Sequence, residues 1–324
     1  MPVMTYIEAI SDGLRYEMRR DERVFVMGED VGIYGGAFKV TKGFLEEFGP
    51  DRVYDTPLAE SAIMGVGIGC ALVGLRPVVE FQFADFITSA FNQVVNNLGT
   101  MYFRSGIPCP VTIRCPSGAN VHGGPFHSQN PEAWFVHTPG LKVVSPSTPY
   151  DAKGLIISAI RDDDPVLYFE HKYLYRRIKE DVPEGEVFVP IGIADIKREG
   201  EDLSVIAYGS AVHMALEAAD KLEGEGISVE VMDLRSLYPY DKEAIVRTVQ
   251  KTGRVLVAHE DWLTAGVGAE IAAFIAQECF EMLDAPVLRV ATMDSPYPFS
   301  SVLEEHMLLN SAKVEAALRR LARY

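Results

Sequence analysis

Short apolar runs rich in β-branched residues alternate with longer stretches of helical periodicity along most of the chain. The first 20 residues have the amphipathic pattern of a helix. In the first half, the pattern predicts strands over residues 24–27, 77–83, 111–114, 142–145 and 166–170. It predicts helices over residues 60–75, 86–103 and 149–160. Alternation of this kind is typical of a parallel sheet covered by helices on both faces, so we expect an α/β fold.

The pattern changes over residues 176–202, which are charged, contain proline and glycine, and show no long periodic element. Such a segment is typical of a domain linker. The alternation then restarts, with strands expected over residues 203–208, 228–233, 254–259 and 287–291. Helices are expected over residues 211–222, 242–251, 268–282 and 311–322. A chain of 324 residues is long for a single core. We therefore expect domains over residues 1–175 and 203–324, joined by a linker over residues 176–202.

Composition and charge narrow the class of protein. Apolar residues make up 48% of the chain and charged residues 23%, as in ordinary globular proteins. The net charge of −16 at pH 7 would repel nucleic acids and anionic membranes, so neither is expected as a partner. No apolar run reaches the ~18 residues of a membrane span, and the N-terminus resembles neither a signal nor a transit peptide. A cytoplasmic protein is expected.

Three segments could carry chemistry. In residues 55–61, Thr56 and Pro57 form a stiff turn and Glu60 begins an apolar, glycine-rich helix. Glu60 is either a simple first-turn charge favoured by the helix dipole, or a partly buried carboxylate with a shifted pKa. Further along this helix, Gly65 and Gly69 share one face and would let another backbone approach, either within the domain or from another subunit.

The second segment, residues 121–135, is a polar loop that holds two histidines and paired glycines. His122 and His127 have no carboxylate at metal-ligand spacing, so acid–base or substrate-orienting work by His127 is the better functional interpretation. The third segment, residues 80–86, ends a predicted strand, where ligands of parallel sheets bind. There Gln82 could offer a hydrogen bond and Phe86 a ring face.

Several motifs are absent. The chain has no GxxxxGK(S/T), no HExxH and no GxSxG. It also lacks a GDG followed about 30 residues later by asparagine, the arrangement that holds magnesium and diphosphate in thiamine enzymes.

Long stretches of the sequence nevertheless resemble one family. In the first half these are GEDVG, DRVYDTPLAES, GLRPVVEFQFADF, FHSQNPEA and PGLKVVSPSTPYDAKGL; in the second half they are VMDLRSLYPYD, KTGRVLVAHE and LDAPVLRV. The chain is similar to the β subunits of thiamine-diphosphate-dependent 2-oxo acid dehydrogenases, the decarboxylase components of 2-oxo acid dehydrogenase complexes. It looks most like the branched-chain type.

The resemblance implies a fold and partners. The expected fold is a parallel-sheet, pyrimidine-binding thiamine diphosphate domain followed by an α/β domain like the C-terminal domain of transketolase. The expected assembly is a heterotetramer of two α and two β subunits, with thiamine diphosphate between an α and a β subunit. The α subunit would hold Mg2+ and the diphosphate, so the missing GDG is expected. The second domain would serve dimerisation and dock the peripheral subunit-binding domain of the lipoyl-bearing acyltransferase core, with Asp294 and the carboxylate of Tyr324 as contacts.

The resemblance also implies roles for individual residues. Glu60 matches a glutamate that hydrogen-bonds the pyrimidine ring and favours the tautomer that deprotonates the thiazolium C2. Neighbouring cofactor contacts match Leu58, Gln82 and Phe86, which is a tyrosine in many branched-chain enzymes. Glu29 fits an acidic residue of the channel that links two cofactor sites. His127 matches a histidine that bonds the substrate-derived group and assists acyl transfer to the lipoyl group.

A structural potassium site is implied as well. Its oxygen ligands in relatives match Val111, Thr112, Ala159, Asp162 and Asp164. Relatives often have asparagine at the last of these positions, and an aspartate-rich turn between helix and strand is the plain alternative.

The expected function is oxidative decarboxylation of branched-chain 2-oxo acids such as 3-methyl-2-oxobutanoate, with reductive acylation of the lipoyl group. Pyruvate dehydrogenase and acetoin dehydrogenase β subunits are the enzymatic alternatives. A catalytically silent scaffold subunit and a self-sufficient thiamine enzyme are the others. Retention of both Glu60 and His127 favours an enzyme over a scaffold.

Overall fold

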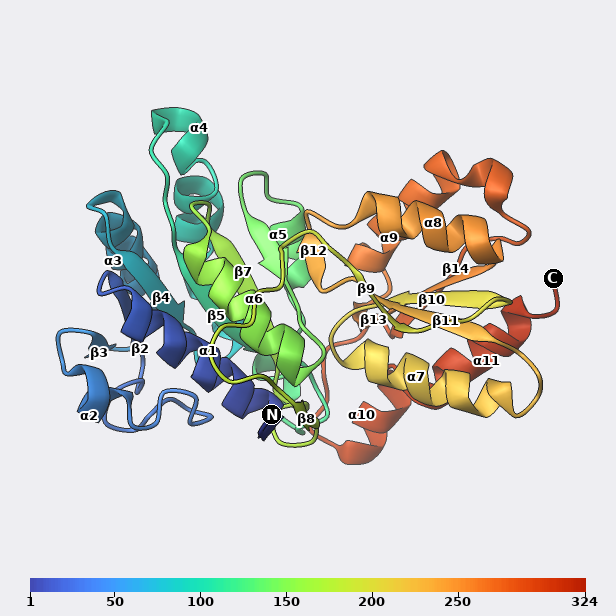
Figure 1. The fold of residues 1–324 in the computed structure, drawn as a ribbon, viewed down its shortest axis with the longest axis horizontal. Coiled ribbons are helices and arrows are strands. Elements are labelled where there is room, and N and C mark those ends of the chain that lie inside the picture. The colour runs from blue at the N-terminus through green and yellow to red at the C-terminus, as the bar shows by residue number, and fades with distance from the viewer. The chain divides into compact units, whose positions relative to one another are not determined.

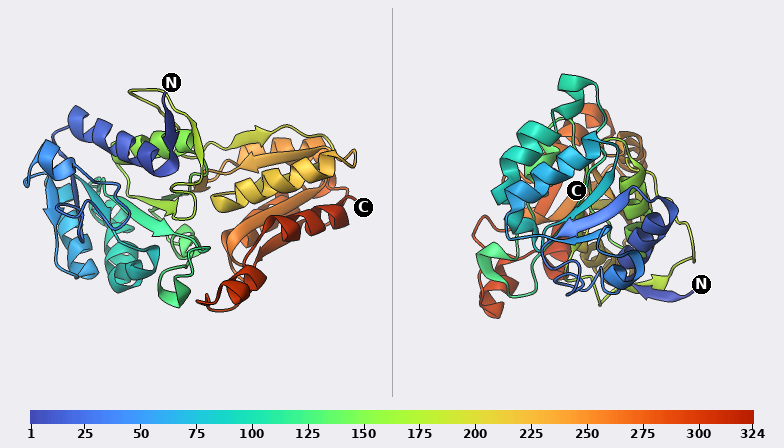
Figure 2. Two further views of the ribbon diagram at one scale, coloured as in Figure 1. Left: turned by 90° about the horizontal axis from the view of Figure 1, so that it is seen from below. Right: turned by 90° about the vertical axis from the view of Figure 1, so that its left-hand side faces the viewer.

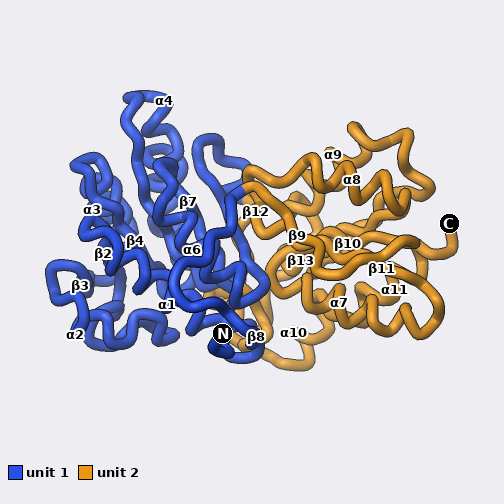
Figure 3. Tube along the Cα trace, in the orientation of Figure 1, with its two compact units in different colours: residues 1–117, 134–191 blue, residues 118–133, 192–324 orange.

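The computed structural model describes all 324 residues, and they form two compact units (Figure 3). The first unit comprises residues 1–117 and 134–191, and the second comprises residues 118–133 and 192–324. The loop over residues 118–133 therefore groups with the second unit although it interrupts the first in sequence. None of the helices is long and apolar enough to cross a membrane.

The first unit is built on a parallel sheet with the strand order β6-β7-β5-β4-β2-β3. The strands are β2 (Val24–Gly28), β3 (Val53–Asp55), β4 (Arg76–Glu80), β5 (Thr112–Ser117), β6 (Lys142–Val144) and β7 (Val166–His171). A separate antiparallel pair joins β1 (Val3–Thr5) to β8 (Lys179–Asp181). The parallel α/β arrangement expected from the alternating pattern is confirmed for this unit.

Helices cover both faces of this sheet (Figures 1 and 2). The α-helices are α1 (Tyr6–Arg20), α2 (Phe44–Phe48), α3 (Glu60–Leu72), α4 (Met101–Ser105), α5 (Glu132–Val136) and α6 (Pro149–Arg161). Helices α1 and α6 pack together on one face, and α3 lies on the other. Between β4 and α4 in the sequence, the chain forms a 3-10 helix (Ala84–Ala90) and a π-helical turn (Gln93–Leu98).

The expected helix over residues 86–103 is thus a succession of short helical types rather than one regular α-helix. Side-chain bonds to the helix backbone provide a physical reason. The amide of Asn97 donates to the backbone carbonyl of Asn92 at 3.5 Å, and the hydroxyl of Thr100 donates to the backbone carbonyl of Asn96 at 2.6 Å. Such local side-chain hydrogen bonds compete with the regular helical pattern.

Helix α1 is stabilised both by a capping box at its N-terminus and by an apolar face that packs in the core. Thr5 accepts the N–H of Glu8 at 3.4 Å, and the Glu8 carboxylate accepts the N–H of Thr5 at 2.8 Å, which completes a capping box. The core-facing residues recur at helical spacing and are buried: Tyr6, Ile7, Ile10, Leu14 and Met18. At the crossing with α6, a Cβ on Gly13 would lie 2.7 Å from Ile156, so glycine permits the close contact.

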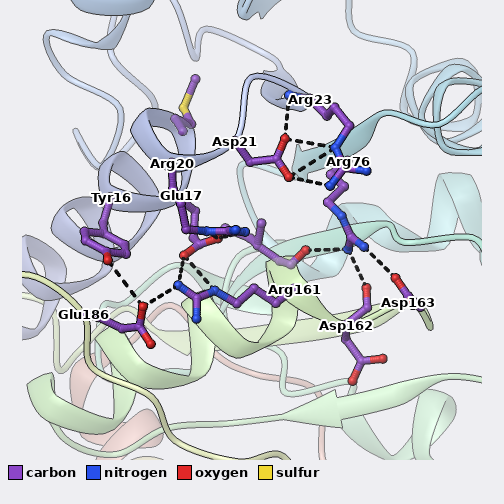
Figure 4. A network of polar contacts seen from close by, with 12 residues as sticks. Tyr16, Glu17, Arg20, Asp21, Arg23, Arg76, Arg161, Asp162, Asp163 and Glu186 are labelled. Carbon is purple, nitrogen blue, oxygen red and sulfur yellow. Dashed lines mark hydrogen bonds and ion pairs between the residues drawn. The ribbon is translucent and has the colours of Figure 1, made fainter.

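A network of ion pairs joins α1 to α6 beside this crossing (Figure 4). Glu17 is fully buried, and its two oxygens accept from Arg20 at 2.7 Å and Arg161 at 2.8 Å. Arg161 also pairs with Glu186 at 2.9 Å, and its pKa is raised by the carboxylates of Glu186 and Glu17. The buried carboxylate is therefore fully paired, as burial of charge requires.

A second ionic group lies inside the sheet itself. Arg114 on β5 is buried between Glu80 on β4 and Glu170 on β7, its neighbours on either side. It pairs directly with Glu80 and contacts Glu170 at 2.6 Å. Burial raises the pKa of Glu80, and the positive charge of Arg114 works against that rise.

Replacing Arg114 by methionine is expected to lower the free energy of unfolding by about 3–5 kcal/mol, because two buried carboxylates lose their only shared cation. Urea unfolding followed by far-UV circular dichroism measures this. Arg247→Met is the control: its side chain is exposed and pairs weakly with Glu243 at 3.9 Å. A loss for Arg114→Met no larger than that of the control would contradict the structural role.

The second unit holds a five-stranded sheet with the order β14-β13-β10-β11-β9. Neighbouring strands are parallel except β9, which is antiparallel to β11. The strands are β9 (Asp195–Arg198), β10 (Leu203–Ala207), β11 (Val229–Asp233), β13 (Val255–Trp262) and β14 (Leu288–Thr292), and a short strand β12 (Ser236–Tyr238) follows β11. Two short strands, β8 and β9, lie within the expected linker.

Helices α7 and α11 cover one face of the second sheet, and α8 and α9 cover the other (Figure 1). The helices are α7 (Ser210–Glu223), α8 (Lys242–Thr252), α9 (Val267–Glu278), a 3-10 turn (Phe280–Met282), α10 (Ser301–Met307) and α11 (Ser311–Leu321). The small residues of α7 that face the sheet are buried: Ala211, Ala215, Ala218 and Ala219. They let the helix lie close to the strands.

Candidate active site

The residues expected around a cofactor come together at one edge of the first sheet. Strands β3, β2 and β4 are neighbours and run parallel, so their carboxyl ends share that edge. Glu29 follows β2 directly, Gln82 follows β4, and Glu60 begins α3 after the loop that leaves β3. Ligands of open parallel sheets bind beyond these ends. Three segments that are separate in the sequence thus come together at one edge of the sheet.

Glu60 is half-buried at the first turn of α3. It borders an open hollow of about 510 Å³, whose other lining residues are Ala59, Ser61, Ala62, Gly65, Ser89 and Gln93. The preceding loop is tied to the sheet because the N–H of Thr56 donates to the carbonyl of Gly28 at 2.9 Å. The carboxylate is therefore held at the helix N-terminus, where the dipole favours negative charge.

Glu29 is the most perturbed carboxylate in this group. It is only 4% exposed, and neither of its carboxylate oxygens has a hydrogen-bond partner. Burial raises its pKa to about 7, and the negative charges of Glu60 and Asp30 contribute to the rise. A carboxyl group with a pKa near neutrality can hold or release a proton at working pH.

The loop after β2 is shaped by close backbone approaches. The Asp55 carboxylate accepts the N–H of Gly32 at 2.6 Å and that of Ile33 at 3.2 Å. A Cβ on Gly28 would lie 2.6 Å from the carbonyl oxygen of Glu80, so only glycine fits between the neighbouring strands. These contacts fix Glu29 over the sheet edge.

The remaining expected contacts differ in how firmly they are held. Gln82 donates to the Asp30 carboxylate at 3.0 Å, and Asp30 itself has a left-handed backbone with φ 59°. Phe86 is half-buried, and its ring meets Phe83 edge-on with centroids 5.4 Å apart. Leu58 is 80% exposed, so a bound group or partner can cover it without rearrangement of the unit.

The sequence did not single out Ser61, Ser89, Gln93 or Asp30, which line the hollow or hold Gln82. Gln93 lies in the π-helical turn, and its amide reaches the Ser61 hydroxyl at 3.4 Å. A regular helix over this region would have turned the side chain differently, so no signal in the linear pattern marks it.

His127 lies in the loop over residues 118–133, directly after a 3-10 turn (Gly124–Phe126), and is half-buried. His122, its neighbour in the loop, is exposed and pairs with Glu304. Because this loop groups with the second unit, the role of His127 beside Glu60 stays a prediction.

The aspartates of the implied potassium site are engaged by basic side chains. Lys142 donates to Asp162 at 2.7 Å and contacts Asp164 at 3.1 Å. Burial opposes the charge of Lys142, but its bonds to the two aspartates outweigh burial and raise its pKa. Arg76 donates to the carbonyl oxygens of Ile160 and Asp162 at 2.9 and 3.0 Å. Several oxygens of this turn thus already face the side chains of Lys142 and Arg76, and the potassium site stays a prediction.

Comparisons with known proteins bear on the family of the chain. Residues 3–177 match the transketolase pyrimidine binding domain, and residues 192–314 match the transketolase C-terminal domain. A 2-oxoisovalerate dehydrogenase subunit beta of Bacillus subtilis (strain 168) is 53% identical to the chain over 327 residues, covering 100% of both. The chain belongs to the β-subunit family of thiamine-diphosphate-dependent 2-oxo acid dehydrogenases. The family and the α/β fold class expected from the sequence are confirmed.

Other members of the family are nearly as similar. The pyruvate dehydrogenase E1 component subunit beta of Bacillus subtilis (strain 168) is 49% identical over 326 residues, covering 100% of both chains. A solved structure described as a split gene transketolase, inactive beta4 tetramer, aligns with a TM-score of 0.81 at 26% identity. It covers 99% of this chain and 98% of that one. As a β subunit of this family, the chain works with an α partner in a thiamine-diphosphate-dependent system.

The pKa of Glu29 leads to a prediction about stability. Its folded-state pKa of about 7 lies above the ordinary value of 4.5, so its ionised form costs stability increasingly as pH rises through this window. Glu29→Gln mimics the neutral acid. We expect stability equal to wild type below pH 4.5 and a gain on the order of 2 kcal/mol above neutral pH.

Urea unfolding of the chain from pH 4 to pH 8 measures this gain. Glu22→Gln is the matched control, because it makes the same chemical change at an exposed position. A Glu29→Gln variant that gains nothing at high pH would show that the Glu29 carboxylate is ionised without cost.

Proposed function

We propose that this chain is the β subunit of a branched-chain 2-oxo acid dehydrogenase and binds the pyrimidine ring of the cofactor. The supporting observation is the convergence of Glu60, Glu29 and Gln82 at the carboxyl ends of three neighbouring parallel strands. The chain brings carboxylates, an amide and ring faces to this edge but no diphosphate-binding motif. That set fits the aminopyrimidine half of thiamine diphosphate and leaves Mg2+ and the diphosphate to an α subunit.

Thiamine diphosphate, when bound, supplies a thiazolium ring that stabilises the negative charge released by decarboxylation. Glu60 would accept a hydrogen bond from the pyrimidine ring and hold it in the reactive tautomer. Phe86 would pack against that ring, with Leu58 and Gln82 as further contacts. Glu29, neutral for part of the time near pH 7, would limit the repulsion that two adjacent carboxylates impose and would hold a proton near the ring.

The other expected roles complete the proposal. His127 would bond the substrate-derived group and assist its transfer to the lipoyl group. Residues 1–175 would form the pyrimidine-binding domain, and residues 203–324 would serve dimerisation and docking of the acyltransferase core. The Asp294 carboxylate suits docking of a basic partner, because hydrogen bonds from Thr264 lower its pKa and keep it charged.

Glu60→Gln, co-expressed with the α subunit, is expected to assemble normally and to lose decarboxylation by about 100-fold or more. The neutral amide keeps the size of the side chain but weakens the hydrogen bond to the pyrimidine. Assembly is measured by size-exclusion chromatography and turnover by CO2 release. Glu46→Gln, an exposed change on α2, is the control. Near wild-type turnover in Glu60→Gln would sink the catalytic assignment and favour a silent scaffold.

The branched-chain substrate rests on similarity. The 2-oxoisovalerate dehydrogenase relative is 53% identical, against 50% and 49% for pyruvate dehydrogenase relatives of Staphylococcus epidermidis (strain ATCC 35984) and Bacillus subtilis (strain 168). The segments QFADF and EHKYLYR resemble the corresponding segments of branched-chain enzymes.

A substrate panel with the matched α subunit decides between these alternatives. We expect kcat/KM for 3-methyl-2-oxobutanoate to exceed that for pyruvate by at least about tenfold, because one or two methyl groups in an apolar pocket are worth about 1–3 kcal/mol. Acetoin is assayed alongside. A higher kcat/KM for pyruvate or acetoin would replace the branched-chain assignment while leaving the β-subunit family unchanged.

A further inference from the structure

The loop over residues 118–133 has little internal structure to hold its shape. It contains one 3-10 turn, and Gly118 donates its N–H to the carbonyl of Gln129 at 3.2 Å. Two of its non-glycine residues, Asn120 and His122, have left-handed backbones with φ 62° and 56°. Such conformations persist only where the surroundings enforce them. The loop's geometry, and with it that of His127, must therefore depend on contacts from other elements.

Glu260 on β13 supplies the central contact. Its side chain is buried, at 3% exposure. One carboxylate oxygen accepts the N–H of Ala119 at 2.8 Å and the side-chain amide of Asn130 at 3.2 Å. The other oxygen accepts the hydroxyl of Ser210, the first residue of α7. The Glu260 carboxylate thus accepts hydrogen bonds from the loop on both sides of His127. Ser210, at the start of α7, donates to the same carboxylate.

Further contacts act around this one. The Glu304 carboxylate on α10, 1% exposed, accepts the N–H of Asn120 at 2.9 Å. The hydroxyl of Tyr297 lies 3.4 Å from the Asn130 amide. Gly124 packs so closely on Phe299 that a Cβ would lie 2.3 Å from its ring. Among these contacts from outside the loop, that of Glu260 is distinct because its carboxylate accepts hydrogen bonds from both ends of the loop.

We propose that Glu260 is a positioning residue for His127, acting through the loop over residues 118–133. This rests on the proposed role of His127 in acyl transfer. Hydrogen bonds to a buried carboxylate are roughly twice as strong as neutral ones, so Glu260 restricts the loop to one conformation. The second unit then contributes to catalysis by fixing a side chain and not only by assembly.

The first test measures the loop itself in the assembled heterotetramer with thiamine diphosphate and Mg2+. Amide hydrogen exchange is followed by mass spectrometry for peptides covering residues 118–133 and, as an internal reference, α3. Glu260→Ala should speed exchange in the loop by about tenfold or more and leave α3 unchanged. Glu230→Ala is the matched control, because Glu230 is similarly buried in the same unit, at 2% exposure, but accepts from Thr248 and Lys251 and not from the loop. Loop exchange unchanged in Glu260→Ala would overturn the proposal.

The second test is a double-mutant cycle on lipoyl acylation. Glu260→Ala should slow acyl transfer by about 10- to 100-fold, as expected for a misplaced catalytic group. In a His127→Ala background the same change should cost nothing further, because its effect runs through His127. Losses that multiply in the double variant would overturn the positioning role. Glu260→Gln, whose amide oxygen can still accept from Ala119, should recover part of the rate and serves if Glu260→Ala fails to assemble.

The two hypotheses fail in different ways. Undiminished acyl transfer in His127→Ala would overturn the proposed role of His127 and this inference with it. A slowed His127→Ala variant combined with wild-type exchange and rate in Glu260→Ala would overturn only the positioning role of Glu260.

Discussion

The guanidinium of Arg114 is the constraint on which the first unit depends. It lies between Glu80 and Glu170 at the centre of the sheet and so joins β4, β5 and β7 side by side. A buried cation with carboxylates on both sides tolerates no sliding of the strands, because any shift in register would leave a charge unpaired in the core. The candidate site lies at the ends of β3, β2 and β4, and its geometry is only as fixed as that register.

A second electrostatic feature is distributed over the site. Glu29 and Glu60 come from different strand ends and repel each other, and burial of Glu29 adds to the cost of its charge. Folding thus keeps two carboxylates close together at a cost in free energy. Such costs are common where groups are arranged for chemistry and not for stability. The glycines and the Asp55 bonds of the loop after β2 keep these carboxylates in place against that cost.

Much of the fold could be predicted from the sequence because its strands are buried on both faces. Short runs of mostly apolar and aromatic residues, such as those that begin Val24–Gly28 and Val166–His171, mark them directly. Helix α10 (Ser301–Met307) escaped prediction because it carries exposed apolar residues, Val302 and Leu303, and has no clear amphipathic face. The irregular helical region after Phe83 was not predicted, because bonds from the side chains of Asn97 and Thr100 to backbone carbonyls leave no periodic signature in the sequence.

Some residues of the candidate site could likewise be proposed from the sequence, whereas others could not. Glu60, Gln82 and Phe86 could be proposed from the sequence because each lies at a recognisable strand or helix end within a short motif. Glu260 could not, because Ala119 and Glu260 are separated by 141 positions and their contact is decided by tertiary structure. No local pattern indicates which carboxylate will face which backbone amide across such a separation in sequence, so this contact is defined only by the folded structure.

Helix α3, which begins with Glu60, has a surface that affects how the subunit can be produced. A Cβ added at Gly65 or Gly69 would meet nothing within 4 Å, whereas one at Gly67 would touch Val79, so packing within the unit accounts for only one of the three glycines. Val66 beside them is 52% exposed and Val73 79%. Water against such an apolar, side-chain-poor stripe costs about 25 cal/mol for each Å² left uncovered. A chain produced in excess of whatever covers this stripe is prone to self-association and inclusion-body formation, so balanced co-production matters for obtaining it in native form.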